Sequence, residues 1–240
     1  MQNLLFAAYG QPLVICDSAD FSSDRMDRGA GLDGAADSKS GILSAWVRLD
    51  GGDGGALRVL NSTGDTLLLL RRTDNLIGIG AENSINTEIL LLLSDTAYTA
   101  SATWLHILAS WNLATAAAHL YISDVEDLAA GPTLTDDTID YTVADWAVGV
   151  SMDGCLAEVY FAPGQYLDFS VVTNRRKFVS SALKPVYLGT DGSLPTGTAP
   201  IVYFHLADAE AVANFATNRG TGGDFSITGT LATGSTSPSG

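Results

Sequence analysis

Apolar and polar residues alternate along several segments of this chain, and a period of two indicates half-buried β-strands rather than helices. Between residues 43 and 49 the odd-numbered positions are apolar, while Trp46 and Arg48 would face the other side. Residues 104–111 and 155–161 repeat this alternation. Further strands are expected at 57–60, 67–71, 76–79, 88–93, 118–122, 146–150, 201–206 and 225–228. Turn sequences rich in Gly, Asp and Asn separate these strands, which favours a sandwich or barrel over a βαβ sheet.

Helical spacing is confined to short segments. Residues 170–180 carry apolar side chains at helical intervals, with Asp168 or Ser170 as the cap and Pro185 as the stop. A second, short helix is expected at 208–214. The sequence therefore predicts an all-β protein, a two-sheet antiparallel β-sandwich with one or two short helices.

The chain shows no interior linker and no internal repeat, so we expect one sandwich domain over residues 1–228. Residues 229–240 are rich in Gly, Ser and Thr, which is typical of a tail or linker. We expect this C-terminal extension to pack against a neighbour during assembly.

Composition excludes several classes of protein. Apolar residues make up 46% of the 240 residues and charged residues only 16%, which excludes a disordered chain. The net charge of −15 disfavours nucleic acid and anionic membranes as partners.

No apolar run is long enough to span a bilayer. We expect no signal peptide, because no basic segment precedes the N-terminal apolar stretch. Cys16 and Cys155 are expected to be small buried residues rather than a disulfide.

No catalytic signature is apparent. Gly29–Gly34 matches G-x-G-x-x-G, but a loop precedes it and a strand follows, so a dinucleotide site is not expected. The three histidines lack metal-ligand spacing. Glycoside hydrolysis needs two carboxylates, whereas Glu158 and Glu88 are each the lone acid of an expected strand. We therefore expect no enzyme activity and no catalytic residues, and a glycan-cleaving enzyme is the least favoured alternative.

Two acidic loops are candidate calcium sites, one with Asp50 and Asp53, the other with Asp136, Asp137 and Asp140. Calcium prefers six to eight oxygen ligands, and neither loop matches an EF-hand. We expect solvated loops, with no metal and no other cofactor.

Aromatic residues are candidates for sugar binding where a ring lies beside a polar loop. The tryptophans inside expected strands are interpreted as core residues. Tyr141, Trp146 and Tyr166 lie near expected loops and are the candidate ligand-binding residues.

Four segments with strand-like alternation follow one another along the chain, GILSAWVRLDG (41–51), TWLHILASWN (103–112), HLYISD (119–124) and MDGCLAEVYF (152–161). Taken in order, they resemble the concanavalin A-like lectin/glucanase (laminin G-like) jelly roll. The resemblance implies a jelly-roll sandwich and says little about chemistry. The glucanase acid motif of that family is missing, and no calcium ligand of its lectins can be placed on this sequence.

A second resemblance is carried by residues 31–50, 168–180 and 202–239. These segments resemble structural proteins of tailed bacteriophages or prophages that carry this jelly roll. It implies a non-enzymatic virion surface component, either a head decoration or fibre or a tail-associated protein. Such a component would be assembled in the host cytoplasm, with other capsid or tail proteins as partners and a homo-oligomer, such as a trimer, as its state. The alternative function is a lectin-like adhesin that binds host glycans.

Overall fold

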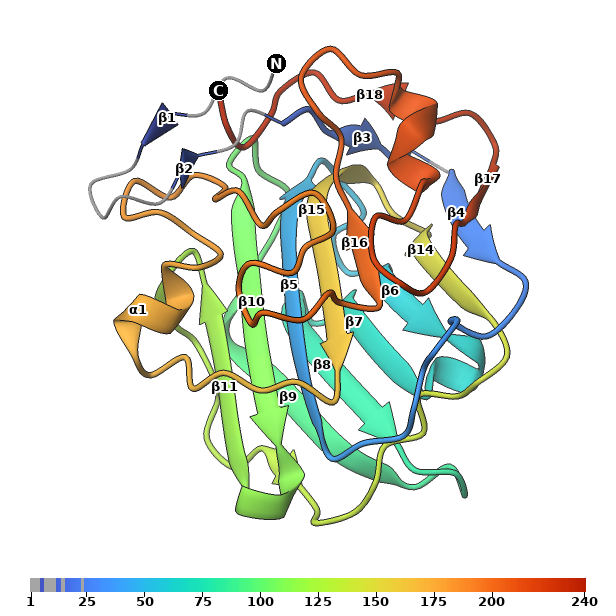
Figure 1. Ribbon diagram of the computed structural model, residues 1–240, viewed down its shortest axis with the longest axis vertical. Coiled ribbons are helices and arrows are strands. Elements are labelled where there is room, and N and C mark those ends of the chain that lie inside the picture. Colours follow the sequence, from blue (N-terminus) through green and yellow to red (C-terminus); the bar gives the residue numbers. More distant parts are fainter. Residues whose placement is uncertain (1–4, 7–11, 14–15, 23) are drawn as a thin grey trace.

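The computed structural model describes residues 5–6, 12–13, 16–22 and 24–240. Two antiparallel sheets pack face to face as a β-sandwich, which confirms the expected fold class (Figure 1). A separate two-stranded pair joins β1 (Leu5–Phe6) and β2 (Pro12–Leu13). Within the described residues, no helix has both the length and the apolar composition to cross a membrane.

We call the first sheet the inner sheet, with strand order β12-β11-β10-β5-β15-β3-β18 and β16 also paired to β15. Its strands are β3 (Ala19–Asp20), β5 (Ser40–Leu49), β10 (Leu105–Asn112), β11 (Ala117–Ile122), β12 (Val125–Glu126), β15 (Gly154–Pro163), β16 (Val202–Phe204) and β18 (Ala232–Thr233). We call the second the open sheet, with order β13-β9-β8-β7-β6-β14-β4-β17. Its strands are β4 (Arg25–Arg28), β6 (Leu57–Ser62), β7 (Leu67–Arg71), β8 (Leu76–Glu82), β9 (Glu88–Ala97), β13 (Thr133–Leu134), β14 (Trp146–Val150) and β17 (Ser226–Thr228).

The main core lies between the two sheets and follows from the alternation in each strand. On β8, for example, Ile77 and Ile79 face this core. The packing is close enough to require a glycine at one position of β5. A Cβ on Gly41 would lie only 2.4 Å from the Trp111 ring, which fills that space instead.

A second apolar cluster covers the outer face of the inner sheet. The chain between 163 and 200 crosses this face (Figure 1). Phe178 packs there against both Tyr160 and Phe169. Both faces of β5 and β15 are consequently buried. The expectation of half-buried strands at 43–49 and 155–161 is wrong for this reason. The outer face of the open sheet carries no comparable layer among the described residues.

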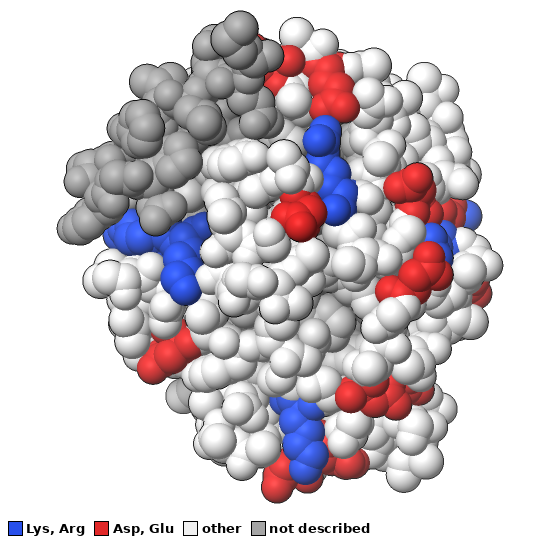
Figure 2. All heavy atoms as spheres, viewed as in Figure 1, with Lys and Arg blue, Asp and Glu red and all other residues white. Residues whose placement is uncertain are grey.

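Several charged side chains on this covered side form ion pairs. Figure 2 shows most of the basic side chains lying beside acidic ones, while one basic group lies apart from any acidic side chain. Asp124, for instance, accepts from both Arg175 and Arg176, at 2.7 and 2.5 Å.

The helices are shorter than expected. α1 spans only Val172–Arg175, and 3₁₀ turns occur at Thr63–Asp65, Leu113–Thr115 and Val212–Ala216. The helix ends at Arg175 because Phe178 packs into the second apolar cluster, on the outer face of the inner sheet. Val179 in turn forms an isolated β-bridge with Pro185. The second expected helix, at 208–214, is replaced by the last of the 3₁₀ turns.

The C-terminal segment joins the edges of the two sheets. β17 pairs with β4 at the edge of the open sheet, and β18 pairs with β3 at the edge of the inner sheet. Farther on, the Thr236 hydroxyl accepts hydrogen bonds from Trp104 Nε1, at 3.1 Å, and from Arg48. We call residues 226–240 the C-terminal clasp. The neighbour that its last residues pack against is thus this same chain.

Candidate ligand-binding groove

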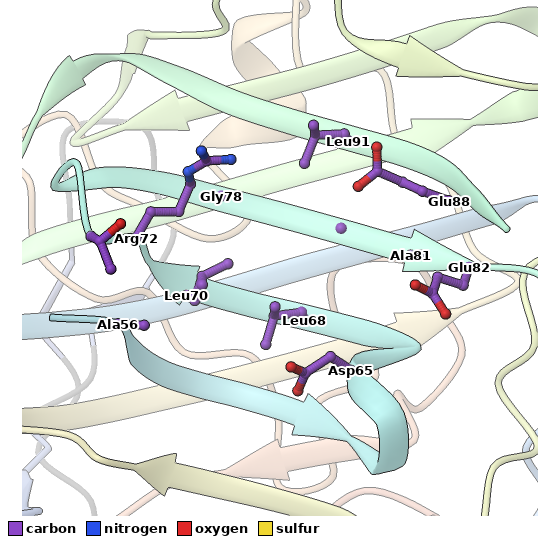
Figure 3. Close-up of a pocket in the computed structure, with 12 residues that line it drawn as sticks. Ala56, Asp65, Leu68, Leu70, Arg72, Gly78, Ala81, Glu82, Glu88 and Leu91 are labelled. Carbon is purple, nitrogen blue, oxygen red and sulfur yellow. The ribbon is translucent and has the colours of Figure 1, made fainter. Parts of the chain in front are cut away.

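A groove of about 360 Å³ runs along β8 on the outer face of the open sheet. Its walls are leucines of the two neighbouring strands, Leu68 and Leu70 from β7 and Leu91 from β9 (Figure 3). Gly78 and Gly80 of β8 also line the groove and form its floor. The volume lies within the roughly 300–1,000 Å³ usual for small-molecule sites.

The strand register explains the shape of the groove. Gly80 pairs with Leu68 on one side and Leu91 on the other, so two leucines flank a position without a side chain. A Cβ at Gly80 would have no neighbour closer than 3.9 Å, so the fold itself does not require glycine there. Gly78 is more tightly enclosed, because Leu70 and Leu93 would lie 3.2 and 3.4 Å from its Cβ. Glycine inside a strand weakens the sheet and often marks a place where another molecule comes close.

Two charged side chains of the groove already have partners. Arg72 lines the groove and forms an ion pair with Asp74 at 3.2 Å. Asp65 also lines it and forms an ion pair with Arg58 at 2.9 Å. These exposed pairs contribute little to stability but hold their side chains beside the groove.

Glu82 and Glu88 also line the groove, and they are direct partners across the β8–β9 hairpin. Like charges in that relation are destabilising. Unlike Asp65 and Arg72, neither carboxylate has a hydrogen-bond or ion-pair partner among the described residues. The groove therefore combines an apolar floor with two carboxylates whose hydrogen-bonding capacity is unused.

Sequence reasoning identified Glu88 as a lone acid and did not single out Glu82. The two are six residues apart, on either side of the turn at 83–87, and become partners only through the hairpin register. The one sequence feature that could have predicted this pairing is the turn-forming Asn83-Ser84, because a turn between two strand patterns indicates a hairpin.

Two of the aromatic candidates belong to the core. Tyr141 is 0% exposed, accepts a hydrogen bond from Trp111 Nε1 at 3.0 Å and donates to the Ser40 carbonyl at 3.2 Å. Trp146 is 1% exposed and lies against Phe161, with ring centroids 5.7 Å apart. A ring enclosed on both faces cannot stack on a sugar, so these two residues are not ligand-binding candidates.

The third aromatic candidate, Tyr166, lies on the covering layer of the inner sheet. It is partly exposed, and its hydroxyl is 3.1 Å from His119 Nε2, which also lies 3.2 Å from Asp168. Burial lowers the pKa of His119, although the Asp168 carboxylate opposes that shift. Tyr166 is not part of the groove on the open sheet, and its binding role stays a prediction.

Glu158 is enclosed rather than open to a substrate. It occupies a β-bulge of β15 with φ of +50°, and its carboxylate accepts from the Tyr203 hydroxyl at 2.9 Å and contacts His205 Nδ1. Cys16 lies in the same cluster, where burial and then the charge of Glu158 raise the pKa of its thiol. Cys16 and Cys155 are both free and buried, as expected.

The acidic loops are engaged in contacts within the chain. Asp50 pairs with Arg48 and Asp53 with Arg71, at 2.6 and 2.8 Å. In the second loop the acids bond to nearby side chains, namely Asp136 to Lys39, Asp137 to Asn83 and Asp140 to Thr142. Across the described residues, no three His, Cys, Asp or Glu side chains are grouped to hold a metal ion.

No protein-family model and no curated protein matches this chain. Among solved structures, it is similar to a Bacteroides ovatus protein described provisionally as carbohydrate binding, with a TM-score of 0.62 and 12% identity. That alignment covers 94% of this chain but only 62% of the other, so the chain spans less than two thirds of its neighbour. At this identity the similarity establishes a shared fold alone, and it agrees with the jelly-roll expectation.

Two further solved structures align more weakly, with TM-scores below 0.5. A heptameric SAP-like pentraxin from Limulus polyphemus aligns at 9% identity over 64% of this chain and 78% of its own, with a TM-score of 0.46. The binding domain of botulinum neurotoxin DC, solved with rat synaptotagmin II, aligns at 11% identity over 70% and 48%, with a TM-score of 0.41.

Proposed function

We propose that the protein is a lectin-like, carbohydrate-binding β-sandwich and that its groove along β8 holds the sugar. The observation that carries this proposal is the pair Gly78 and Gly80, which opens a leucine-walled hollow on the uncovered sheet face. The fold shared with a protein described provisionally as carbohydrate binding supports the same reading.

The groove offers the two kinds of contact that a sugar needs. The C–H face of a pyranose ring can lie on Gly80 between Leu68 and Leu91, which removes apolar surface of both molecules from water. Hydroxyl groups at the ring edge can donate to Glu82 and Glu88, and hydrogen bonds to a charged acceptor are the stronger kind.

Binding without cleavage is the activity that we propose. The virion location expected from the second sequence resemblance stays a prediction, and glycan binding is compatible with it. A binding protein leaves its ligand intact, so incubation with a bound oligosaccharide should release no new reducing ends. Release of reducing ends would contradict the non-enzymatic function.

The first test is a glycan array, followed by isothermal titration calorimetry with each positive glycan. Wild-type protein should bind at least one glycan, and Gly80→Val should lose that binding because its methyl groups occupy the floor of the groove. Gly29→Val is the matched control, since Gly29 is exposed and a Cβ there meets nothing within 4 Å. Equal binding by wild type and Gly80→Val would overturn the proposal for this groove.

A further inference from the structure

We infer that the ligand of this groove carries a protonated amino group, as a glycan of amino sugars with free amines does. The inference rests on the proposed function and concerns the chemical class of the sugar. It follows from the charges that line the groove and from which of them are already neutralised.

The lining of the groove contains three carboxylates and one guanidinium. Arg58 neutralises Asp65, and Asp74 neutralises Arg72, so these charges are balanced within the protein. The charges that are not balanced are those of Glu82 and Glu88, which lie opposite each other on β8 and β9 and have no cationic partner among the described residues. A cation on the ligand would relieve the repulsion within this pair.

The position of the pair fits a charged group at the edge of a sugar ring. Glu82 follows Gly78 and Gly80 on the same face of β8, because residues two apart point to one side of a strand. Glu88 closes the same end of the groove from β9 (Figure 3). A ring that rests on Gly80 therefore places one of its edge substituents next to both carboxylates.

An organic cation fits this arrangement better than a metal ion. Calcium takes about six to eight oxygen ligands, whereas the groove offers two unpaired carboxylates beside leucines. An ammonium group has three donors, which two carboxylates and one further acceptor can satisfy. The same negative charge, together with the net charge of −15, disfavours sulfated or sialylated glycans.

The inference is tested by titrating the protein with two oligomers of equal length, one of glucosamine and one of N-acetylglucosamine, at about pH 6, where an amine is protonated. We expect the glucosamine oligomer to bind about tenfold more tightly, a ratio that corresponds to roughly 1.4 kcal/mol. In the double variant Glu82→Gln and Glu88→Gln, the two oligomers should bind with equal affinity.

A control with the same change of net charge separates a specific site from general attraction to an acidic protein. Glu126→Gln combined with Asp208→Asn alters two exposed carboxylates outside the groove and should keep the preference for the amine. Equal affinity of wild type for both oligomers would overturn the inference. So would a preference that survives in the Glu82→Gln and Glu88→Gln variant, or one that is lost in the control.

Failure of the inference is distinguishable from failure of the proposed function. If neutral glycans bind in the groove but the free amine adds nothing, the charge argument is wrong and the carbohydrate-binding proposal stands. If no glycan of any class binds on the array or in solution, both are wrong.

Discussion

Replacing Glu158 by alanine tests whether the buried cluster of Glu158, Tyr203 and His205 stabilises the fold. The Glu158 side chain is 3% exposed, and His205, at 4%, contacts one of its carboxylate oxygens. The other carboxylate oxygen accepts from Tyr203. The alanine variant removes the acceptor and leaves a buried imidazole and a buried phenol without their partner.

The expected loss of stability can be worked out from these contacts. Two hydrogen bonds to a charged acceptor contribute about 1.5–3 kcal/mol each, so their loss costs about 3–6 kcal/mol. For a chain of this size each kcal/mol lowers the Tm by about 2–4 °C. We therefore expect Tm to fall by roughly 6–24 °C.

Urea unfolding followed by circular dichroism measures this free energy, and Glu126→Ala serves as the control. Glu126 is exposed on β12, so its replacement should change the free energy of unfolding by no more than about 0.5 kcal/mol. Glu158→Gln keeps one acceptor and should lie between wild type and Glu158→Ala. If Glu158→Ala stays within about 1 kcal/mol of wild type, the structural role is refuted.

Three further predictions concern the clasp, the core and the thiols. Deleting residues 226–240 should expose the edges of β3 and β4 and promote self-association, which light scattering would detect; a stable monomer would contradict the role of the clasp. Gly41→Ala should lower the free energy of unfolding by about 1–3 kcal/mol, because the new methyl group meets the Trp111 ring; an unchanged urea midpoint would refute this contact. Cys16 should react slowly with a thiol reagent in the native state and quickly in urea, because burial and then the Glu158 charge raise its pKa; fast native labelling would show that the thiol is accessible.

The strands were the part of the fold that could be predicted from sequence, because alternation reflects the burial of one face. The segments at 67–71 and 146–150 were expected with the bounds that the structure has. The helix at 170–180 was not predictable at its true length, because its end depends on contacts of Phe178 with distant strands. Local spacing cannot report such contacts.

The candidate site could be predicted far less well than the fold. Tyr141 and Trp146 are near loops along the chain, but both side chains point into the core, and sequence position does not reveal that direction. Conversely, the strand register with β7 and β9 alone places Gly80 between two leucines and Glu82 opposite Glu88. A groove whose floor consists of glycines has no sequence motif that would reveal it in a single sequence.

The most direct test of the central claim is a titration of ¹⁵N-labelled protein with a bound glycan, followed by two-dimensional NMR. We predict that the largest amide shifts occur at Gly78 and Gly80 and that Gly29 and Gly131 do not respond. Shifts that cluster instead at Gly164, in the loop hollow near the end of β15, would contradict the groove as the binding site.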